Sequence, residues 1–338
     1  MASYNNFIVQ NVAPPNATNI FVYNANGTKV CEIPVGTLAF PRAGDKLYSF
    51  GAISDIHLQY ETAQDDFQRA LTYLNEAEDV AFTCICGDLT HTGSHSDLTD
   101  YKTYVDTYSP DTPVYAITGN HECWSGLDLV NVISDYIEQP LYYSFTHRND
   151  VFIMVGIVKE QEGALFTTAE LQWLYETLEA NRNKRCFVFT HVRPQDGCGN
   201  AYEIYTYDLW GGTEQIVFES LMKHYKNAHL FHGHSHLKFD LQTKDNLANI
   251  DSLFGGWSIH IPSLSVPRTG SVVGASSRQE IYADSEGYVV DVYENGIYLK
   301  GRDFVNEKFL PIASYWLDTT LKTIEANTFV DSTGLITI

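Results

Sequence analysis

Short apolar runs alternate with amphipathic stretches through most of the chain. Six runs with the length and composition of buried strands occupy residues 47–54, 80–86, 113–118, 151–158, 186–190 and 228–232. Between them, apolar residues recur at helical spacing in residues 62–79, 96–108, 167–180 and 213–226. This alternation predicts an α/β domain in which helices cover largely buried strands.

Two of the predicted helices begin with a capping signal. Thr62 and Asp65 resemble a capping box, and Thr167 with Glu170 has the same spacing. The last helix, in residues 213–226, carries one apolar stripe that we expect to pack on the core: Ile216, Val217, Leu221 and Tyr225.

The two ends of the chain differ from its middle. Residues 1–46 contain short β-like runs and turn signals but are too few to bury a large core, so we interpret them as a small β appendage. Residues 47–318 are expected to form the main domain, and residues 319–338 a tail packed on it. Within the main domain, residues 287–304 predict a hairpin that turns at Glu294-Asn295-Gly296.

Composition and charge exclude several classes of partner. The chain has 338 residues, with 42 acidic against 21 basic residues and a net charge of −21. This balance argues against a nucleic-acid polymer and against anionic membranes as partners, because both are bound through Lys and Arg. Cys84 and Cys86 are too poorly placed for a disulfide on one strand, so we expect packed thiols.

The sequence contains no targeting or membrane segment that we recognise. It lacks both a signal peptide and a run of about 18 apolar residues. The compartment is therefore cytoplasmic if the N-terminus is native, or extracellular if a signal peptide was removed. The oligomeric state stays open.

Polar clusters follow five of the six apolar runs. Ligands of α/β proteins lie at the carboxyl ends of strands, so these clusters are expected to converge on one crevice. Imidazole and carboxylate groups suit transition metals such as Mn, Fe or Zn, and the clusters hold enough of them for two ions. The clusters are Asp55 with His57, Asp88, Asn120 with His121 and Glu122, His191, and His234 with His236.

In order, these clusters give the pattern D-x-H, G-D, G-N-H-E, H and G-H-x-H, which resembles the calcineurin-like metallophosphoesterase family over residues 49–305. The resemblance implies a metallo-dependent phosphatase fold, an αββα sandwich of two mixed sheets flanked by helices. It also implies two bound transition-metal ions, Mn, Fe or Zn. Residues 1–46 carry no part of the resemblance.

The resemblance further implies a role for each residue. Asp88 would bridge the two ions, and His121 would assist the leaving group while a metal-bridging hydroxide attacks phosphorus. The first ion would be held by Asp55, His57 and His236, and the second by Asn120, His191 and His234. The purple acid phosphatase branch differs from this chain at the positions of His57 and His91, so its coloured iron–tyrosinate site is not expected here.

Residues beside the ligands have open interpretations. His91 either lines the substrate pocket or is a solvated loop histidine, and Arg193 either clamps a phosphate oxygen or pairs on the surface. Glu122 either orients His121 or makes a plain structural contact. Trp124 and the aromatic loop 201–210 either wall the pocket or pack. His232 is expected to be buried and hydrogen-bonded, and His95 to lie on the surface near a helix start.

These features favour a metal-dependent enzyme that hydrolyses a small phosphodiester. A phosphomonoesterase remains an alternative, since the ligand set is compatible with both. An alternative of another class is a catalytically idle, metal-containing binding or structural module, surface-exposed or phage-associated. The complete ligand set favours the enzyme.

Overall fold

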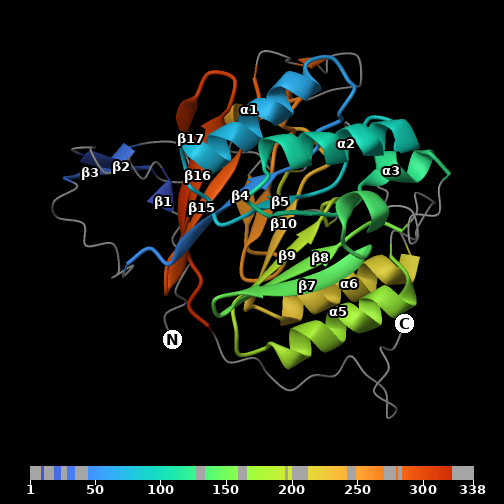
Figure 1. Ribbon diagram of the computed structural model, residues 1–338. Coiled ribbons are helices and arrows are strands. Elements are labelled where there is room, and N and C mark those ends of the chain that lie inside the picture. Colours follow the sequence, from blue (N-terminus) through green and yellow to red (C-terminus); the bar gives the residue numbers. More distant parts are fainter. Residues whose placement is uncertain are drawn as a thin grey trace, which may run out of the picture.

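Two β-sheets pack face to face and helices cover their outer faces, as expected for the αββα sandwich (Figure 1). The computed structural model describes residues 9–10, 19–23, 29–34, 45–126, 134–158, 166–194, 197–199, 212–241, 249–269, 279–280 and 284–321. Most of the expected appendage and tail, and the aromatic loop 201–210, lie outside these residues.

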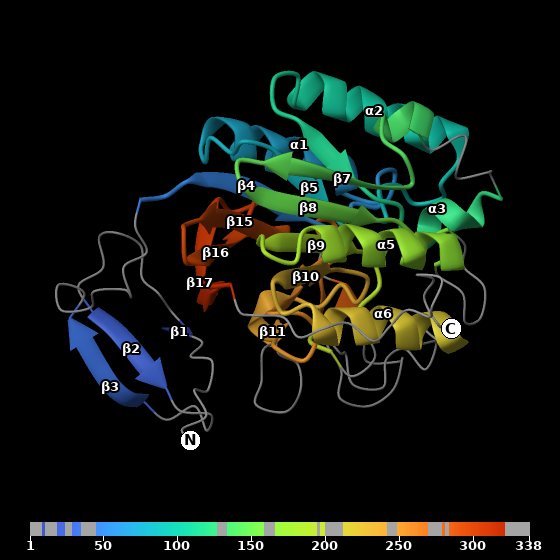
Figure 2. The same ribbon diagram turned by 90° about the horizontal axis from the view of Figure 1, so that it is seen from below.

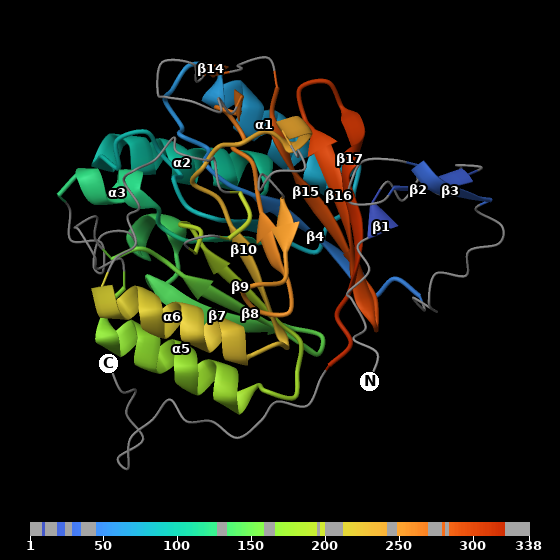
Figure 3. The same ribbon diagram turned by 180° about the vertical axis from the view of Figure 1, so that it is seen from behind.

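The first sheet has seven strands in the order β1-β17-β16-β15-β4-β5-β6. Strands β4, β5 and β6 are parallel, and the others are antiparallel to their neighbours. Figure 3 shows β15, β16 and β17 side by side next to β4. The bounds are β1 Val9–Gln10, β4 Tyr48–Ile53, β5 Thr83–Ile85, β6 Val114–Ala116, β15 Glu286–Val292, β16 Gly296–Asp303 and β17 Lys308–Asp318.

The second sheet has six strands in the order β11-β12-β10-β9-β8-β7, of which β8, β9, β10 and β12 are parallel. Its strands are β7 Tyr142–His147, β8 Asp150–Val155, β9 Cys186–Thr190, β10 Ala228–His232, β11 Ile250–Asp251 and β12 Ser258–His260. Two short pairs complete the strands: β2 Asn19–Tyr23 with β3 Lys29–Pro34, and β13 Arg268–Thr269 with β14 Gln279–Glu280.

Helices cover one face of each sheet (Figure 2). Helices α1 and α2 pack on the first sheet, and α5 and α6 pack on the second. Their bounds are α1 Ala63–Glu76, α2 His95–Tyr108, α5 Thr168–Ala180 and α6 Gly212–His224, with the short helix α3 Asn120–Trp124 and the 3-10 turn Phe239–Leu241. None of the described helices combines the length and the apolar character needed to span a bilayer.

Successive side chains of each strand point to opposite faces of its sheet, which separates the core into layers. In β8, Val151 and Ile153 face helices α5 and α6, whereas Phe152 and Met154 face the other sheet. The layer between the sheets is rich in aromatic rings, and the ring centroids of Phe50 of β4 and Phe152 of β8 are 5.3 Å apart. Both sheets are therefore buried on two faces, which is why their strands read as continuous apolar runs.

Most local predictions are confirmed. Strands β15 and β16 pair antiparallel as the predicted hairpin. The amide of Glu170 donates to Thr167 Oγ1 (3.1 Å) and the Glu170 carboxylate accepts from the Thr167 amide, which completes a capping box. Cys84 and Cys86 are free, buried thiols.

Two local predictions are wrong. Thr62 has φ −90° and ψ 2°, outside the extended conformation from which a cap side chain reaches the first turn, and its hydroxyl donates to Asp66 instead (2.7 Å). Ile216 is 65% exposed, because the stripe of α6 that faces the sheet passes through Phe218 and Met222.

A buried ion pair joins the two sheets at the edge away from the polar clusters. Arg185, just before β9, donates from Nε and Nη2 to the carboxylate of Asp150, at 2.9 and 2.7 Å. Tyr48 of the first sheet donates its hydroxyl to the same carboxylate (2.6 Å), and Arg185 Nη1 donates to the carbonyl of Tyr293 (2.7 Å). The Arg185–Asp150 pair thus ties the second sheet to two segments of the first, through the carboxylate to Tyr48 and through the guanidinium to Tyr293.

Replacing Arg185 by methionine should lower the free energy of unfolding by about 3–5 kcal/mol, because Asp150 would remain buried without its partner. Chemical denaturation measures the change. The matched control is Arg182→Met, three residues earlier on an exposed side chain, which should change stability by no more than about 0.5 kcal/mol. Equal losses of unfolding free energy in the two variants would show that the buried pair adds no more stability than an exposed arginine does.

Candidate metal centre

The polar clusters lie at the carboxyl ends of parallel strands from both sheets. Asp55 and His57 follow β4, Asp88 follows β5, and Asn120 starts α3 after β6, all from the first sheet. His191 follows β9 and His234 follows β10, both from the second sheet. The two sheets therefore deliver their clusters to a common edge, so the predicted convergence is confirmed.

Five of the candidate ligands adopt left-handed backbone conformations. These are Asp55 (φ 53°), His57 (φ 48°), Asp88 (φ 49°), His234 (φ 70°) and His236 (φ 58°). Such conformations cost a residue with a Cβ about 1–3 kcal/mol each and persist only where the surroundings enforce them. The sharp turns aim successive polar side chains into the same space.

Glycines beside the ligands permit close approach of the backbone. A Cβ on Gly119 would lie 2.1 Å from Asp88 Oδ1, and a Cβ on Gly233 would lie 2.4 Å from Asp55 Oδ2. Both contacts are far inside van der Waals distance. The glycines of G-N-H and G-H-x-H are therefore required by packing against the two carboxylates.

The first group of candidate ligands contains Asp55, His57, Asp88 and His236, whose ligand atoms all lie within 4.8 Å of one another. His57 Nε2 and His236 Nε2 are 3.0 Å apart, and His236 Nε2 is 3.0 Å from Asp55 Oδ1. All four residues are buried.

The second group contains Asp88, His191 and His234, so Asp88 belongs to both groups. His191 Nε2 lies 3.2 Å from Asp88 Oδ2 and 3.2 Å from His234 Nδ1. The side-chain oxygen of Asn120 lies 3.1 Å from His191 Nε2. The seven residues expected from the sequence thus form two adjoining clusters that share one carboxylate.

Backbone carbonyls fix the orientation of two rings. His191 Nδ1 donates to the carbonyl of Cys86 (2.7 Å), and His236 Nδ1 donates to that of Val266 (3.1 Å). In the neutral ring of His236 the proton is then on Nδ1, and the lone pair of Nε2 points into the cluster. In His191 the same kind of bond turns Nε2 toward the cluster. This arrangement is typical of histidines that bind a metal.

Burial sets the protonation of most of these groups. Burial lowers the pKa of His57 and His236 well below the usual range, and it lowers the pKa of His234 to about 3. Burial also opposes charge on His191, but the carboxylates of Asp88 and Asp55 outweigh it and raise the pKa of that ring to about 9. The neutral rings can act as ligands, and the shift on His191 reflects negative charge concentrated nearby.

The donor set fits a cation. Asp55 Oδ1 is buried and has no hydrogen-bond donor within the described residues, although His236 Nε2 lies 3.0 Å away. Because His236 already carries its proton on Nδ1, that nitrogen and oxygen face each other with lone pairs. Their proximity is repulsive until a cation lies between them.

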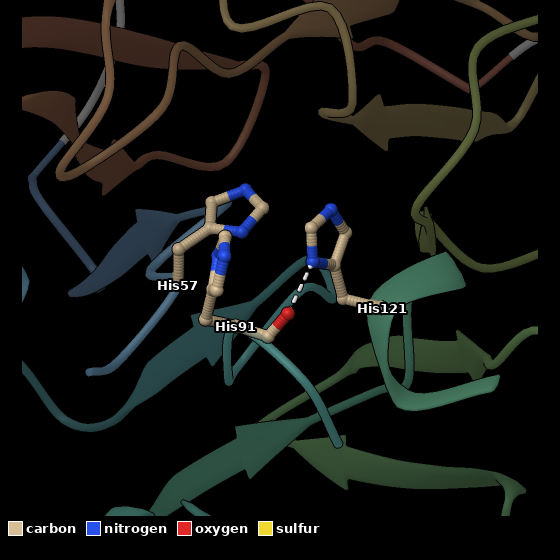
Figure 4. A group of neighbouring side chains, drawn as sticks. All are labelled: His57, His91 and His121. Carbon is tan, nitrogen blue, oxygen red and sulfur yellow. Dashed lines mark hydrogen bonds between the residues drawn. The ribbon is translucent and has the colours of Figure 1, made fainter. Parts of the chain in front are cut away.

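A third histidine group lies on the outer side of the first. Ligand atoms of His57, His91 and His121 all lie within 4.8 Å of one another, and Figure 4 shows the three rings facing a common space. The ring of His121 donates from Nδ1 to the carbonyl of His91 (2.7 Å), which leaves its Nε2 on the side of Asp88, 3.9 Å from Oδ2. Neighbouring aromatic rings support His91 and His121. Tyr60 stacks on His91 with ring centroids 4.5 Å apart, and the ring centroids of Trp124 and His121 are 3.7 Å apart.

Glu122 makes structural contacts behind the cluster. It is fully buried, and its carboxylate accepts from the amide and hydroxyl of Thr90 (3.0 Å each) and from the amide of Gly119 (2.8 Å). The ring of His121 is oriented instead by the carbonyl of His91.

Arg193 lies near the second group. It is half-buried, donates to the carbonyl of Pro194 (3.0 Å), and its charge contributes to the lowered pKa of His234. His232 is buried, with Nε2 3.3 Å from Cys198 Sγ, as expected. His95 is exposed at the first residue of α2, also as expected.

Two further residues contribute to the site, although no sequence motif includes them. Tyr60 lies three residues after His57, a spacing that could have marked it as a neighbour of the site. Ser54 donates to Asp55 Oδ2 (2.6 Å) and directly precedes it, but a serine beside an aspartate is too common to be a signal.

Comparison with known proteins gives one family and a shared fold. Residues 48–238 match the family model described as calcineurin-like phosphoesterase. A purple acid phosphatase from yellow lupin (Lupinus luteus) seeds has a similar structure, with a TM-score of 0.56 and 9% identity; the match covers 85% of this chain and 58% of that chain. The protein GAP50, described as the anchor in the inner membrane complex of Plasmodium, matches with a TM-score of 0.54 and 15% identity, over 86% of this chain and 92% of that one. No curated protein matches the sequence.

The shared carboxylate makes metal content a direct test of the cluster. The folded protein should bind about two transition ions per chain, and Asp88→Ala should lose both, because each group would lose the carboxylate that the two groups share. Elemental analysis of the purified protein gives the stoichiometry, with the exposed Asp111→Ala as control. Full stoichiometry in Asp88→Ala would remove the bridging assignment.

Proposed function

Since the chain belongs to the calcineurin-like phosphoesterase family, we propose that it hydrolyses a small phosphodiester with the aid of two transition-metal ions. The observation that carries the proposal is the pair of ligand groups that share Asp88, with His121 beside them. Asp55, His57 and His236 would hold the first ion. Asn120, His191 and His234 would hold the second.

Two ions held there would lower the pKa of a water molecule and stabilise the negative charge that develops on the phosphoryl oxygens. The backbone turns that carry the candidate ligands determine where the ions, and with them the phosphoryl group, would lie. The strained turns fix the ligands before substrate arrives, so little reorganisation is needed during the reaction. The lone pairs of the neutral imidazoles of His57, His234 and His236 are available at neutral pH.

His121 is placed to protonate the leaving oxygen. Its Nδ1 proton is committed to the carbonyl of His91, so the second ring nitrogen, Nε2, is the one that exchanges a proton with substrate. As water adds to phosphorus and the bond to the leaving oxygen breaks, the Nε2 proton passes to that oxygen. The proton that the water loses goes to solvent, from which Nε2 is protonated again. Contact with Trp124 holds the ring in place.

His91 and Arg193 are the proposed contacts to the phosphoryl group. His91 shares the space in front of His57 and His121, and its stacking on Tyr60 fixes the plane of the ring. Arg193 follows β9 of the second sheet, two residues after His191, and offers a guanidinium to an oxygen. The two residues therefore flank the ligand groups from opposite sheets.

Charge favours a diester over a monoester. A monoester is a dianion near neutral pH, whereas a diester carries a single negative charge. The chain has a net charge of −21, so its field disfavours the dianion more strongly. Rates on bis-p-nitrophenyl phosphate and p-nitrophenyl phosphate, measured side by side, test the preference, and faster hydrolysis of the monoester would reverse it. Absence of turnover on both, in fully metal-loaded protein, would favour an idle binding module.

The role of His121 can be separated from binding by the choice of leaving group. His121→Ala should keep both ions and lose about 10²–10⁴-fold in kcat on alkyl phosphodiesters, because an alkoxide needs a proton to depart. The loss on nitrophenyl esters should be clearly smaller, since nitrophenolate leaves largely unprotonated. Steady-state kinetics on the two classes measure the difference.

The exposed His95→Ala serves as the matched control and should change neither rate. Equal losses on both leaving groups in His121→Ala would show that the ring positions substrate or water instead. Loss of metal from that variant would show that His121 is a ligand.

A further inference from the structure

A buried serine lies between the last two candidate ligands. Ser235 separates His234 from His236, and its side chain points away from the ligand groups into the protein. Its hydroxyl lies 2.7 Å from Nε2 of His260, and its Oγ also accepts from the amide of Leu237 (3.4 Å). This hydroxyl therefore attaches the middle of the turn to the core, whereas the amide of His234 bonds Asp55 and the ring of His236 bonds the carbonyl of Val266.

His260 comes from the neighbouring strand of the second sheet. Strand β12 pairs with β10 so that His260 lies beside His232, the last residue before the turn. The amide of His260 donates to the carbonyl of Asn249 (2.7 Å), and its Nδ1 lies 3.3 Å from Asn249 Oδ1. A chain of side chains thus runs from the turn to Asn249.

The surroundings fix the direction of each hydrogen bond in the chain. Asn249 Nδ2 donates to the carbonyl of Phe239 (3.4 Å), so Oδ1 is the atom that faces His260. An amide oxygen only accepts, hence Nδ1 of His260 carries the proton and Nε2 accepts from the hydroxyl of Ser235. Burial supports this neutral ring, because it lowers the pKa of His260 to about 4.

Close packing leaves the His260 ring one position. The ring is fully buried, and a Cβ added to Gly199 (φ 70°) would lie 2.4 Å from His260 Cδ2. A ring so confined can hold a strained turn, whereas a mobile one cannot. His234 and His236 both have positive φ, at 70° and 58°, so the turn needs such support.

We propose that Ser235, His260 and Asn249 form a positioning chain that holds His234 and His236 in the geometry of metal ligands. This inference rests on the proposed metal-dependent function. Residues that orient ligands typically change metal affinity by about 10–100-fold when they are removed. The effect should therefore appear in metal binding itself, before any catalytic step.

Three substitutions separate positioning from general stability. Ser235→Ala removes the hydroxyl. His260→Asn keeps a donor at the position of Nδ1 but cannot reach Ser235, and His260→Gln places an acceptor at the position of Nε2. The control is His229→Asn, which alters another buried histidine of the second sheet, on β10 and away from the turn.

The measurements are metal dissociation constants by chelator competition, visible absorption of the Co²⁺-loaded protein, and thermal stability. Ser235→Ala and His260→Asn should bind metal about tenfold more weakly and shift the Co²⁺ absorption. His260→Gln should retain affinity within roughly threefold of wild type, since it restores the hydrogen bond. His229→Asn should lower thermal stability alone.

Unchanged affinity in Ser235→Ala and His260→Asn would overturn the inference, as would an equal loss in the His229→Asn control. Ser235→Ala is the smallest change and decides the question if a His260 variant does not fold. Weakened metal binding without any phosphoester hydrolysis by wild type would overturn the proposed function but uphold the positioning chain. Wild-type protein that binds no metal would overturn both.

Discussion

Asp88 connects the two halves of the molecule, because its buried carboxylate belongs to both groups of candidate ligands. It follows a strand of the first sheet, yet His191 of the second sheet lies 3.2 Å from its Oδ2. The amide of His121 donates to Oδ1 (2.9 Å). Burial raises the pKa of Asp88, but the neighbouring imidazoles outweigh it and hold the pKa well below the usual range. The site therefore depends on how closely the sheets approach at this edge.

The surrounding structure stabilises an arrangement that is unfavourable by itself. Left-handed conformations at five candidate ligands oppose folding, and so does the burial of Asp55 and Asp88. Serine hydroxyls offset part of this cost, since Ser54 donates to the side chain of Asp55 and Ser263 to its carbonyl (2.8 Å). At the opposite edge, Arg185 joins the sheets and fixes their separation. Strain at the ligands is thus balanced by rigid packing elsewhere, which preorganises the site.

Local sequence patterns predicted a contact correctly only where the surrounding structure supplied the backbone conformation or the burial that the contact needs. The capping box at Thr167 formed because its two partners lie within one turn and the backbone at Thr167 is extended. The same spacing at Thr62 did not give a capping box, because Thr62 has a ψ of 2° instead of an extended conformation, which no local pattern reveals. Ile216 was misplaced because adjacent apolar residues of a helix lie 100° apart, and the sheet selects which of them is buried.

The sequence by itself predicted an α/β domain and placed seven candidate ligands directly after apolar runs, and the resemblance of this ordered pattern to the calcineurin-like family implied the αββα class. Tertiary structure alone decided that the clusters come from two sheets, that Glu122 contacts Thr90, and that Tyr60 supports His91. It also decided that His260 reaches Ser235 across 25 residues. Contacts of this kind depend on strand order and on the packing of the sheets, which no pattern of neighbouring residues specifies.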